Sequence, residues 1–428
     1  MNFIAVIIFT VIFAEFVLNF ISDLLNLRML RSDLPEAFRG WYDADRYMKS
    51  QEYLKVTTRF GWVISSFGLV VFLIFWFSKG FPFMDRCVQA YHQGPVITGI
   101  IYIGVLVILK ALISLPFSIY STFVIEERFG FNKTTWSTFV KDLIKGLFLA
   151  VILGGPLLAG ILAFFEYAGA GAWLYCWIAV ALYMLAVQYI APTWIMPLFN
   201  KFTLLEEGEL KRAIFSYAHS IDFPLENVFV MDGSKRSKKS NAFFTGFGKH
   251  RRIVLFDTLI KQHKVSELVA VLAHEMGHYK KKHIQKTLII GIAQMGVMFF
   301  LLSIFISYQG LFDAFYMDKK SIYAGLIFFG LLYSPVELFT GILMQMLLRK
   351  NEYEADKFSV ETTKDQSSMV NALKKLSVHN LSNLLPHRLY VFLNYSHPPV
   401  LKRIKAIEKL STAIFKNTCT KSPSPLNL

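Results

Sequence analysis

The sequence has few charged residues and very few cysteines for its length. Charged residues make up 18% of the 428 positions, whereas hydrophobic residues make up 54% and the mean hydropathy is +0.44. A soluble chain cannot bury so much apolar surface, so we expect a protein that crosses a lipid bilayer. The three cysteines, Cys87, Cys176 and Cys419, lie far apart, which excludes a disulfide scaffold and any C-x-x-C metal site. A metal would have to be bound by histidine and carboxylate side chains.

Carboxylates are also scarce: the chain has 30 Asp and Glu but 45 Lys and Arg, which gives a net charge of +15. A basic chain can indicate nucleic-acid binding. The basic residues here sort by membrane side and form no base-reading motif, so we expect no nucleic-acid partner.

Seven apolar segments are long enough to span a membrane. They are Phe3–Leu25, Trp62–Phe83, Val96–Ile119, Leu147–Phe165, Ala172–Met196, Thr287–Tyr308 and Ile322–Leu348. The first segment lacks a basic n-region and a small-residue cleavage pattern, so we expect a retained helix and not a cleaved signal peptide. The third contains Lys110, for which a polar interior partner and a snorkelling position both remain open.

The basic residues predict the orientation in the membrane. Alternate loops hold 40 Lys and Arg on one side of the predicted spans and 4 on the other. The positive-inside rule then places the N-terminus outside, and the C-terminus and both large hydrophilic regions in the cytoplasm.

We therefore predict an all-α membrane protein with a small β-hairpin. The predicted parts are five transmembrane helices (1–197), a cytoplasmic segment (198–286), helices six and seven (287–348), a second cytoplasmic segment (349–416) and a disordered tail (417–428). The hairpin is expected from the runs 242–248 and 252–256 around a turn at 248–250. A helix capped by Ser266 is expected to run through His283. Two crossings return the chain to one side, so the two cytoplasmic segments can meet.

The predicted helix carries the pattern H-E-x-x-H, with His274, Glu275 and His278. Residues four apart share one helix face, so both imidazoles can bind a single Zn²⁺. Glu275 is rotated off the metal itself and could accept a proton from a water whose pKa the zinc lowers. Two solvated helix histidines are the alternative. The pattern predicts a zinc metalloprotease site.

A third ligand has to come from elsewhere in the chain. Glu352 and Asp356 are four apart directly after the seventh span, so one could bind the metal while the other bonds a ligand histidine. An ordinary charged helix start is the alternative for both. His283, beside three lysines, is expected to face lipid headgroups. His397 precedes Pro398 and Pro399 and could stabilise an oxyanion, or could simply form a rigid turn.

Taken together, the motifs of the chain resemble those of the type I CAAX prenyl proteases, over about residues 30–410. The resemblance lies in the segments Tyr42–Gln51, Phe123–Thr135, Pro197–Phe202, Ser240–Phe247, Arg252–Leu259, His274–His278, Asn351–Asp356 and Ser396–Pro399, with Arg403.

The resemblance implies a barrel of seven transmembrane helices around a chamber, with a gluzincin-like zinc-protease region on the cytoplasmic side. It implies that Glu352 is the third ligand of one zinc ion and that Asp356 supports a ligand histidine. The substrate backbone would pair with the strand at Asn241, Ala242 and Phe243, while His397 and Arg403 line the active site. The family removes the C-terminal tripeptide from prenylated proteins, so a peptide or protein with a prenylated C-terminus and membrane lipid are the expected partners. The oligomeric state is not predicted.

Some features depart from the family pattern. Leu204 stands where the family often has proline, and Leu348 stands where serine is common. A short loop between spans six and seven and a C-terminus without a dilysine signal are similar to bacterial members. The expected location is the inner membrane for a bacterial protein, or the endoplasmic reticulum for a eukaryotic one. A membrane quality-control protease is the alternative function, followed by a non-catalytic zinc-binding receptor or transporter.

Overall fold

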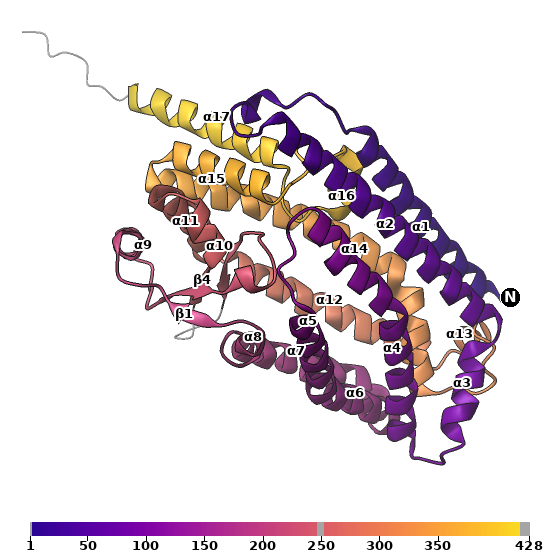
Figure 1. Ribbon diagram of the computed structural model, residues 1–428. Helices are drawn as coiled ribbons and strands as arrows, with labels where there is room; N and C mark the ends of the chain where they lie inside the picture. Colours follow the sequence, from indigo (N-terminus) through magenta and orange to yellow (C-terminus); the bar gives the residue numbers. More distant parts are fainter. Residues whose placement is uncertain (1, 246–251, 420–428) are drawn as a thin grey trace, which may run out of the picture. The chain divides into compact units, whose positions relative to one another are not determined.

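The computed structural model describes residues 2–245 and 252–419 and divides into two compact units (Figure 1). The helical unit comprises Met1–Leu24, Lys55–Phe199 and Thr287–Gly341. The mixed unit comprises Leu25–Leu54, Asn200–Lys286 and Ile342–Leu428. Each unit is therefore assembled from three separate stretches of sequence.

Seven helices in the described part of the chain are long and apolar enough to cross a membrane, as the sequence predicted. They are built from α1 (Phe3–Arg28), α2 (Ala44–Phe77), α4 (Pro95–Tyr120), α5 (Trp136–Leu149) with α6 (Gly155–Tyr167), α7 (Ala172–Ile190) with α8 (Met196–Phe199), α12 (His283–Phe305) and α14 (Ile322–Thr363). The predicted end of the second span at Phe83 is wrong. Its helix ends at Phe77, because Lys79 adopts a left-handed conformation with φ of 60° before α3 (Gly80–Gln89) begins.

Aromatic packing forms the core of the helical unit next to α13 (Gln309–Asp313). The rings of Phe315 and Phe328 stack with centroids 4.0 Å apart, and Trp76 stacks on Phe315 at 4.8 Å. The Trp76 indole N–H donates to the Ala314 carbonyl at 2.8 Å. A buried indole needs such an acceptor, so this bond lets a large ring fill the core without losing a hydrogen bond.

The mixed unit contains a four-stranded sheet in the order β1-β2-β4-β3. The strands are β1 (Phe202–Leu204), β2 (Val228–Met231), β3 (Ala242–Thr245) and β4 (Arg252–Phe256). Strands β3 and β4 pair antiparallel, which confirms the predicted hairpin, while its turn at 248–250 lies outside the described residues. Strands β1 and β2 were not predicted, and β2 pairs parallel with β4.

The unit also contains helices that pack on this sheet or on one another. They are α9 (Glu209–Ser220), α10 (Asp257–Gln262), α11 (Val265–Lys280), α15 (Gln366–His379), α16 (Arg388–Asn394) and α17 (Val400–Cys419). The apolar face of α11, with Leu268, Leu272 and Met276 fully buried, packs in one core with Ile253 and Leu255 of β4. This burial holds the H-E-x-x-H helix rigidly against the sheet.

Three predicted boundaries in the mixed unit are wrong. Helix α11 is capped at Lys264, whose backbone N–H donates to the Glu267 carboxylate at 2.9 Å, and not at Ser266. It ends at Lys280, well before His283, because Lys282 has a φ of 58°. The predicted tail at 417–428 begins inside α17, which continues to Cys419, and its remaining residues lie outside the described part.

The helix of the seventh span continues beyond Leu348, the predicted end of its apolar segment. Helix α14 runs without interruption over 42 residues, from Ile322 to Thr363. The acidic segment that the sequence predicted as a separate start therefore continues the helix that contains the seventh span.

Candidate metal centre

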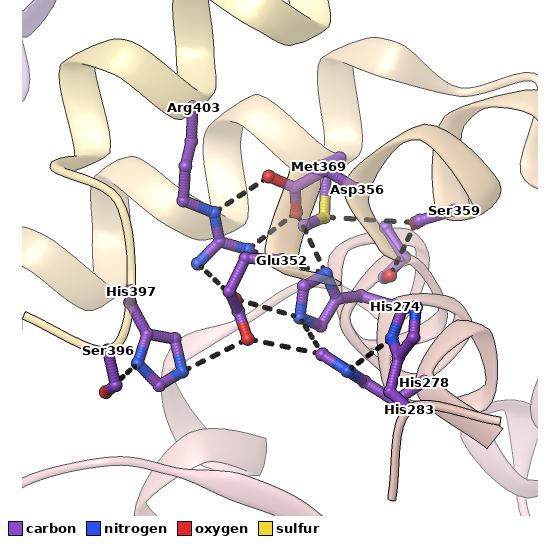
Figure 2. Close-up of polar contacts among 11 residues, drawn as sticks. His274, His278, His283, Glu352, Asp356, Ser359, Met369, Ser396, His397 and Arg403 are labelled. Carbon is purple, nitrogen blue, oxygen red and sulfur yellow. Dashed lines mark hydrogen bonds and ion pairs between the residues drawn. The ribbon is translucent and has the colours of Figure 1, made fainter. Parts of the chain in front are cut away.

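Helix α11 supplies two histidines that face each other (Figure 2). His274 and His278 lie one turn apart on the same face, and their Nε2 atoms are 3.2 Å apart. His274 is buried, while His278 is partly exposed. The structure thus brings together the pair that the spacing of four residues predicted.

Helix α14 supplies a carboxylate to the same point. The Glu352 oxygens lie 3.4 Å from His274 Nε2 and 3.3 Å from His278 Nε2. One ligand atom from each of the three residues lies within 4.8 Å of the others. Asp356, the other candidate ligand, contacts His274 on its opposite ring nitrogen, Nδ1, at 2.9 Å.

A glycine allows the two helices to approach closely enough for this arrangement. A Cβ atom on Gly277 would lie 3.1 Å from Phe358 Cδ1 and 3.3 Å from the Ala355 Cα of α14. Both contacts are tighter than ordinary van der Waals contact, so a side chain at this position would press on α14 and require a shift of a few tenths of an ångström. Gly277 was not identified from the sequence, because only the contact with α14 reveals its role.

The three residues fit a metal such as zinc. A tetrahedral ion with bonds of about 2.0–2.1 Å places its ligand atoms about 3.3 Å apart. The two imidazole Nε2 atoms lie 3.2 Å apart, and each lies 3.3–3.4 Å from one of the two Glu352 oxygens. Within the described residues the buried Glu352 Oε2 has only the longer ion-pair contacts to His274 and Arg403, at 3.4 and 3.3 Å, so a lone pair remains available. Burial lowers the pKa of His274, but hydrogen bonds to Asp356 and Glu352 outweigh it and raise that pKa to about 9. The site therefore attracts positive charge, which a metal can provide in place of a proton.

Arg403 of α17 holds the carboxylates in place. Its Nε donates to Asp356 Oδ2 at 2.8 Å and its Nη2 donates to Oδ1 at 2.6 Å. Its Nη1 lies 3.3 Å from Glu352 Oε2. Burial alone would lower the pKa of Arg403, but the adjacent Asp356 and Glu352 raise it, so the guanidinium stays charged. Arg403 was expected to line the active site, and the structure shows that it binds carboxylates there.

Two further residues expected in the site lie close to the metal ligands. Glu275 follows His274 on α11, and its burial raises the pKa of its carboxyl, against the charges of His274 and His278. A raised pKa suits a carboxylate that must take up and release a proton. His397 is exposed and places its Nε2 3.3 Å from Glu352 Oε1, while Ser396 Oγ lies 3.0 Å from its Nδ1.

The expectation that His283 faces lipid headgroups is wrong. His283 is only 2% exposed, and its Nδ1 lies 3.1 Å from His278 Nδ1 (Figure 2). Its Nε2 lies 3.1 Å from Glu354 Oε2. A continuous helix would have turned His283 away from His278. The break after Lys280 returns it to the site, and no local signal in the sequence predicts that geometry.

Two side chains of α14 that the sequence analysis did not identify hold the segment before His397. Arg349 Nη1 donates to the carbonyls of Val391 and Tyr395, at 3.1 and 2.5 Å. Gln345 Nε2 donates to the Leu393 carbonyl at 3.0 Å. These bonds satisfy carbonyls at the C-terminal end of α16 and attach it to the helix that carries Glu352.

The predicted substrate strand lies at an edge of the sheet. Within the described residues, β3 pairs only with β4. The Phe256 N–H donates to the Asn241 carbonyl, so the alternation of an antiparallel ladder directs the Phe243 backbone to β4 and the Ala242 and Phe244 backbones outward. Phe244 packs on Tyr279 with ring centroids 5.6 Å apart, which places this edge beside α11.

Comparison with known proteins identifies relatives over nearly the whole chain. Residues 23–201 match the CAAX prenyl protease N-terminal family of five membrane helices, and residues 204–411 match peptidase family M48. CAAX prenyl protease 1 of Saccharomyces cerevisiae is 33% identical over 410 residues, covering 90% of both chains. The CAAX prenyl protease 1 homolog of Arabidopsis thaliana is 35% identical over 413 residues, covering 93% of this chain and 97% of its own.

A solved structure has the same fold. The crystal structure of S. mikatae Ste24p matches with a TM-score of 0.90 and 32% identity, over 95% of this chain and all of that one. This match confirms the predicted fold class of seven apolar helices with a small sheet and a zinc-protease region. The relatives named here are eukaryotic, and the expectation of a bacterial-type member stays a prediction.

These matches decide between the functions that the sequence left open. They favour a peptidase over a zinc-binding receptor or transporter, and a CAAX prenyl protease relative over a quality-control protease. They also imply a bound metal. The chain belongs to peptidase family M48, among its CAAX prenyl proteases, and is a membrane metalloprotease.

Proposed function

We propose that this protein hydrolyses a peptide bond near the prenylated C-terminus of a protein substrate, with zinc bound by His274, His278 and Glu352. The observation that carries this proposal is the 3.2–3.4 Å spacing of the two imidazole nitrogens and the carboxylate oxygens. Three protein ligands leave the fourth position of a tetrahedral ion open, as catalytic zinc sites require. When bound, zinc lowers the pKa of water and polarises the substrate carbonyl.

Glu275 is the general base in this mechanism. It neighbours the first ligand on α11 and accepts the proton of the attacking water, then donates it to the leaving amine. The burial that raises the pKa of Glu275 makes the first transfer easier, because the protonated form that results is less costly there than it would be in water.

The substrate is expected to bind along the edge strand of the sheet, β3. An extended peptide adds to β3 through the outward backbone groups of Ala242 and Phe244, and Asn241 and Phe243 keep the strand in register with β4. His397 is exposed beside Glu352 and is placed to donate a hydrogen bond to the developing oxyanion. Asp356 orients His274, and Arg403 keeps Asp356 ionised and fixed.

The test compares the wild type with Glu275→Gln and with Glu361→Gln, an exposed carboxylate of α14 that serves as a matched control. Metal content and cleavage of farnesylated and unmodified CAAX peptides are measured on each purified protein. We expect one zinc in all three and cleavage in the wild type and the control only. Cleavage by Glu275→Gln would exclude Glu275 as the base, and equal rates on the two peptides would exclude a role for the prenyl group.

We further propose that the active site opens to the cytoplasm, because the basic loops cluster on that side of the predicted spans. The exposed Cys87 lies in α3, between spans two and three, and is expected on the opposite side. A Lys238→Cys variant in right-side-out vesicles should resist a membrane-impermeant maleimide that labels Cys87. The reverse labelling pattern would overturn the orientation.

A further inference from the structure

The two histidines of the metal centre are supported in different ways. His274 directs its Nδ1 at the carboxylate of Asp356, at 2.9 Å. His278 directs its Nδ1 at another imidazole, that of His283, at 3.1 Å (Figure 2). His283 in turn places its Nε2 3.1 Å from Glu354 Oε2. The second histidine thus reaches a carboxylate only through an intervening ring.

Helix geometry explains why the intervening ring is needed. Glu352, Glu354 and Asp356 all come from α14, and each residue of a helix is rotated by about 100° from the one before. Asp356 therefore shares the face of Glu352 and reaches His274 directly. Glu354 is rotated by about 200° from Glu352, so it cannot turn toward the same point. His283, which begins α12 after the left-handed Lys282, bridges this gap.

The hydrogen bonds in this chain have one consistent direction. For His278 to bind a metal through Nε2, its ring proton must be on Nδ1. That Nδ1–H then donates to His283 Nδ1, which acts as an acceptor. The proton of His283 must accordingly be on Nε2, from which it donates to the Glu354 carboxylate. Each atom in the chain then has a suitable partner.

We propose that His283, anchored by Glu354, is a positioning residue that holds His278 in its metal-binding tautomer and orientation. This inference rests on the proposed metal site. Partners of this kind fix ring orientation and raise ligand basicity, and their loss typically lowers metal affinity by about 10–100-fold. His283 is almost fully buried, at 2% exposure, so bulk water does not compete with it for the bond to His278.

Two substitutions separate this role from simple packing. The Oδ1 atom of His283→Asn occupies nearly the place of the imidazole Nδ1 and can still accept from His278. The amide of His283→Gln resembles the Nε2 end, so it keeps the contact with Glu354 but offers His278 no acceptor. If His283 only filled space, both substitutions would change zinc affinity equally, because both remove the ring. A positioning role requires that Asn preserve metal binding and that Gln weaken it.

The experiment measures zinc affinity by competition with a chromogenic chelator for the full-length wild type, His283→Asn, His283→Gln and His219→Asn, an exposed histidine of α9 as control. Visible absorption of the cobalt-substituted proteins reports ligand geometry independently of activity. We expect affinity within about threefold of wild type for Asn, a loss of about 10–100-fold for Gln with an altered cobalt spectrum, and no change for the control.

Equal affinities for the Asn and Gln variants, whether both normal or both reduced, would overturn the inference. A wild type that binds zinc while both variants behave alike refutes only the role of His283. A wild type that binds no zinc refutes the proposed metal site itself, so the two failures are distinguishable.

Discussion

Removal of the Arg403 guanidinium should destabilise the metal-free protein strongly. Arg403 is buried and binds Asp356 through two hydrogen bonds of 2.8 and 2.6 Å, while its third nitrogen lies 3.3 Å from Glu352. In Arg403→Met, two buried carboxylates lose their cation. Breaking one side of a buried ion pair costs about 3–5 kcal/mol, because the remaining charge is left without compensation.

The assay is thermal unfolding in detergent after removal of metal by a chelator. For a unit of about 200 residues, each kcal/mol shifts the midpoint by roughly 2–4 °C, so we expect a decrease of roughly 6–20 °C. The unfolding midpoint of Arg403→Lys should lie between those of the wild type and Arg403→Met, because an ammonium keeps the charge but cannot bind both Asp356 oxygens at once. Lys402→Met, on the exposed side of the same helix, is the control and should unfold like the wild type.

A double variant tests the electrostatic cause. Asp356→Leu combined with Arg403→Met removes both partners of the principal ion pair. The double variant should therefore lose less unfolding free energy than the two single variants together, by about 0.5–3 kcal/mol. Strict additivity of the two single changes would refute the ion-pair explanation. So would an Arg403→Met protein that unfolds at the wild-type temperature.

Further predictions concern helix packing, substrate pairing and pH. Gly277→Ala should weaken zinc binding by pressing α11 away from α14, as measured by chelator competition, whereas Gly291→Ala, where a Cβ meets nothing within 4 Å, should not. Ala242→Pro removes one outward backbone N–H and should lower kcat/KM by about fivefold, the equivalent of about 1 kcal/mol, without a large change in unfolding temperature. Burial and the charge of Arg46 lower the pKa of His379 to about 4, so its neutral form stabilises the fold fully above pH 6.5 and this contribution is lost as pH falls toward 4. Allowing for solvent screening, the loss is about 1–2 kcal/mol, and His379→Gln should abolish that part of the acid sensitivity in unfolding measured between pH 4 and 7.

The parts of this protein that could be predicted from sequence depend on local patterns. Apolar runs identified seven membrane-spanning helices, because crossing a bilayer requires a minimum length of apolar chain. The spacing of four residues between His274 and His278 placed both rings on one face, because the α-helix has a fixed pitch. Two short runs on either side of a turn predicted the β3–β4 hairpin for the same kind of reason.

The helix boundaries were less accessible to sequence reasoning. The segment from Arg349 onward is charged, which suggested a new cytoplasmic element, yet α14 continues through it to Thr363. The end of α11 was predicted too late in the sequence, because nothing in the composition indicates that a lysine adopts a left-handed conformation. That single break changed His283 from a predicted surface residue into a buried neighbour of His278.

By itself, the sequence determined that the chain crosses the membrane repeatedly and that one helix carries two histidines spaced to bind a metal and a potential base. Only the tertiary structure showed how closely the other residues expected in that site approach the two histidines. Glu352, Arg403 and His397 come from helices and loops far along the chain, and their distances depend on how closely α11 and α14 pack at Gly277. Spacing within one helix follows from its own hydrogen bonds, whereas spacing between helices is set by the side chains that meet there.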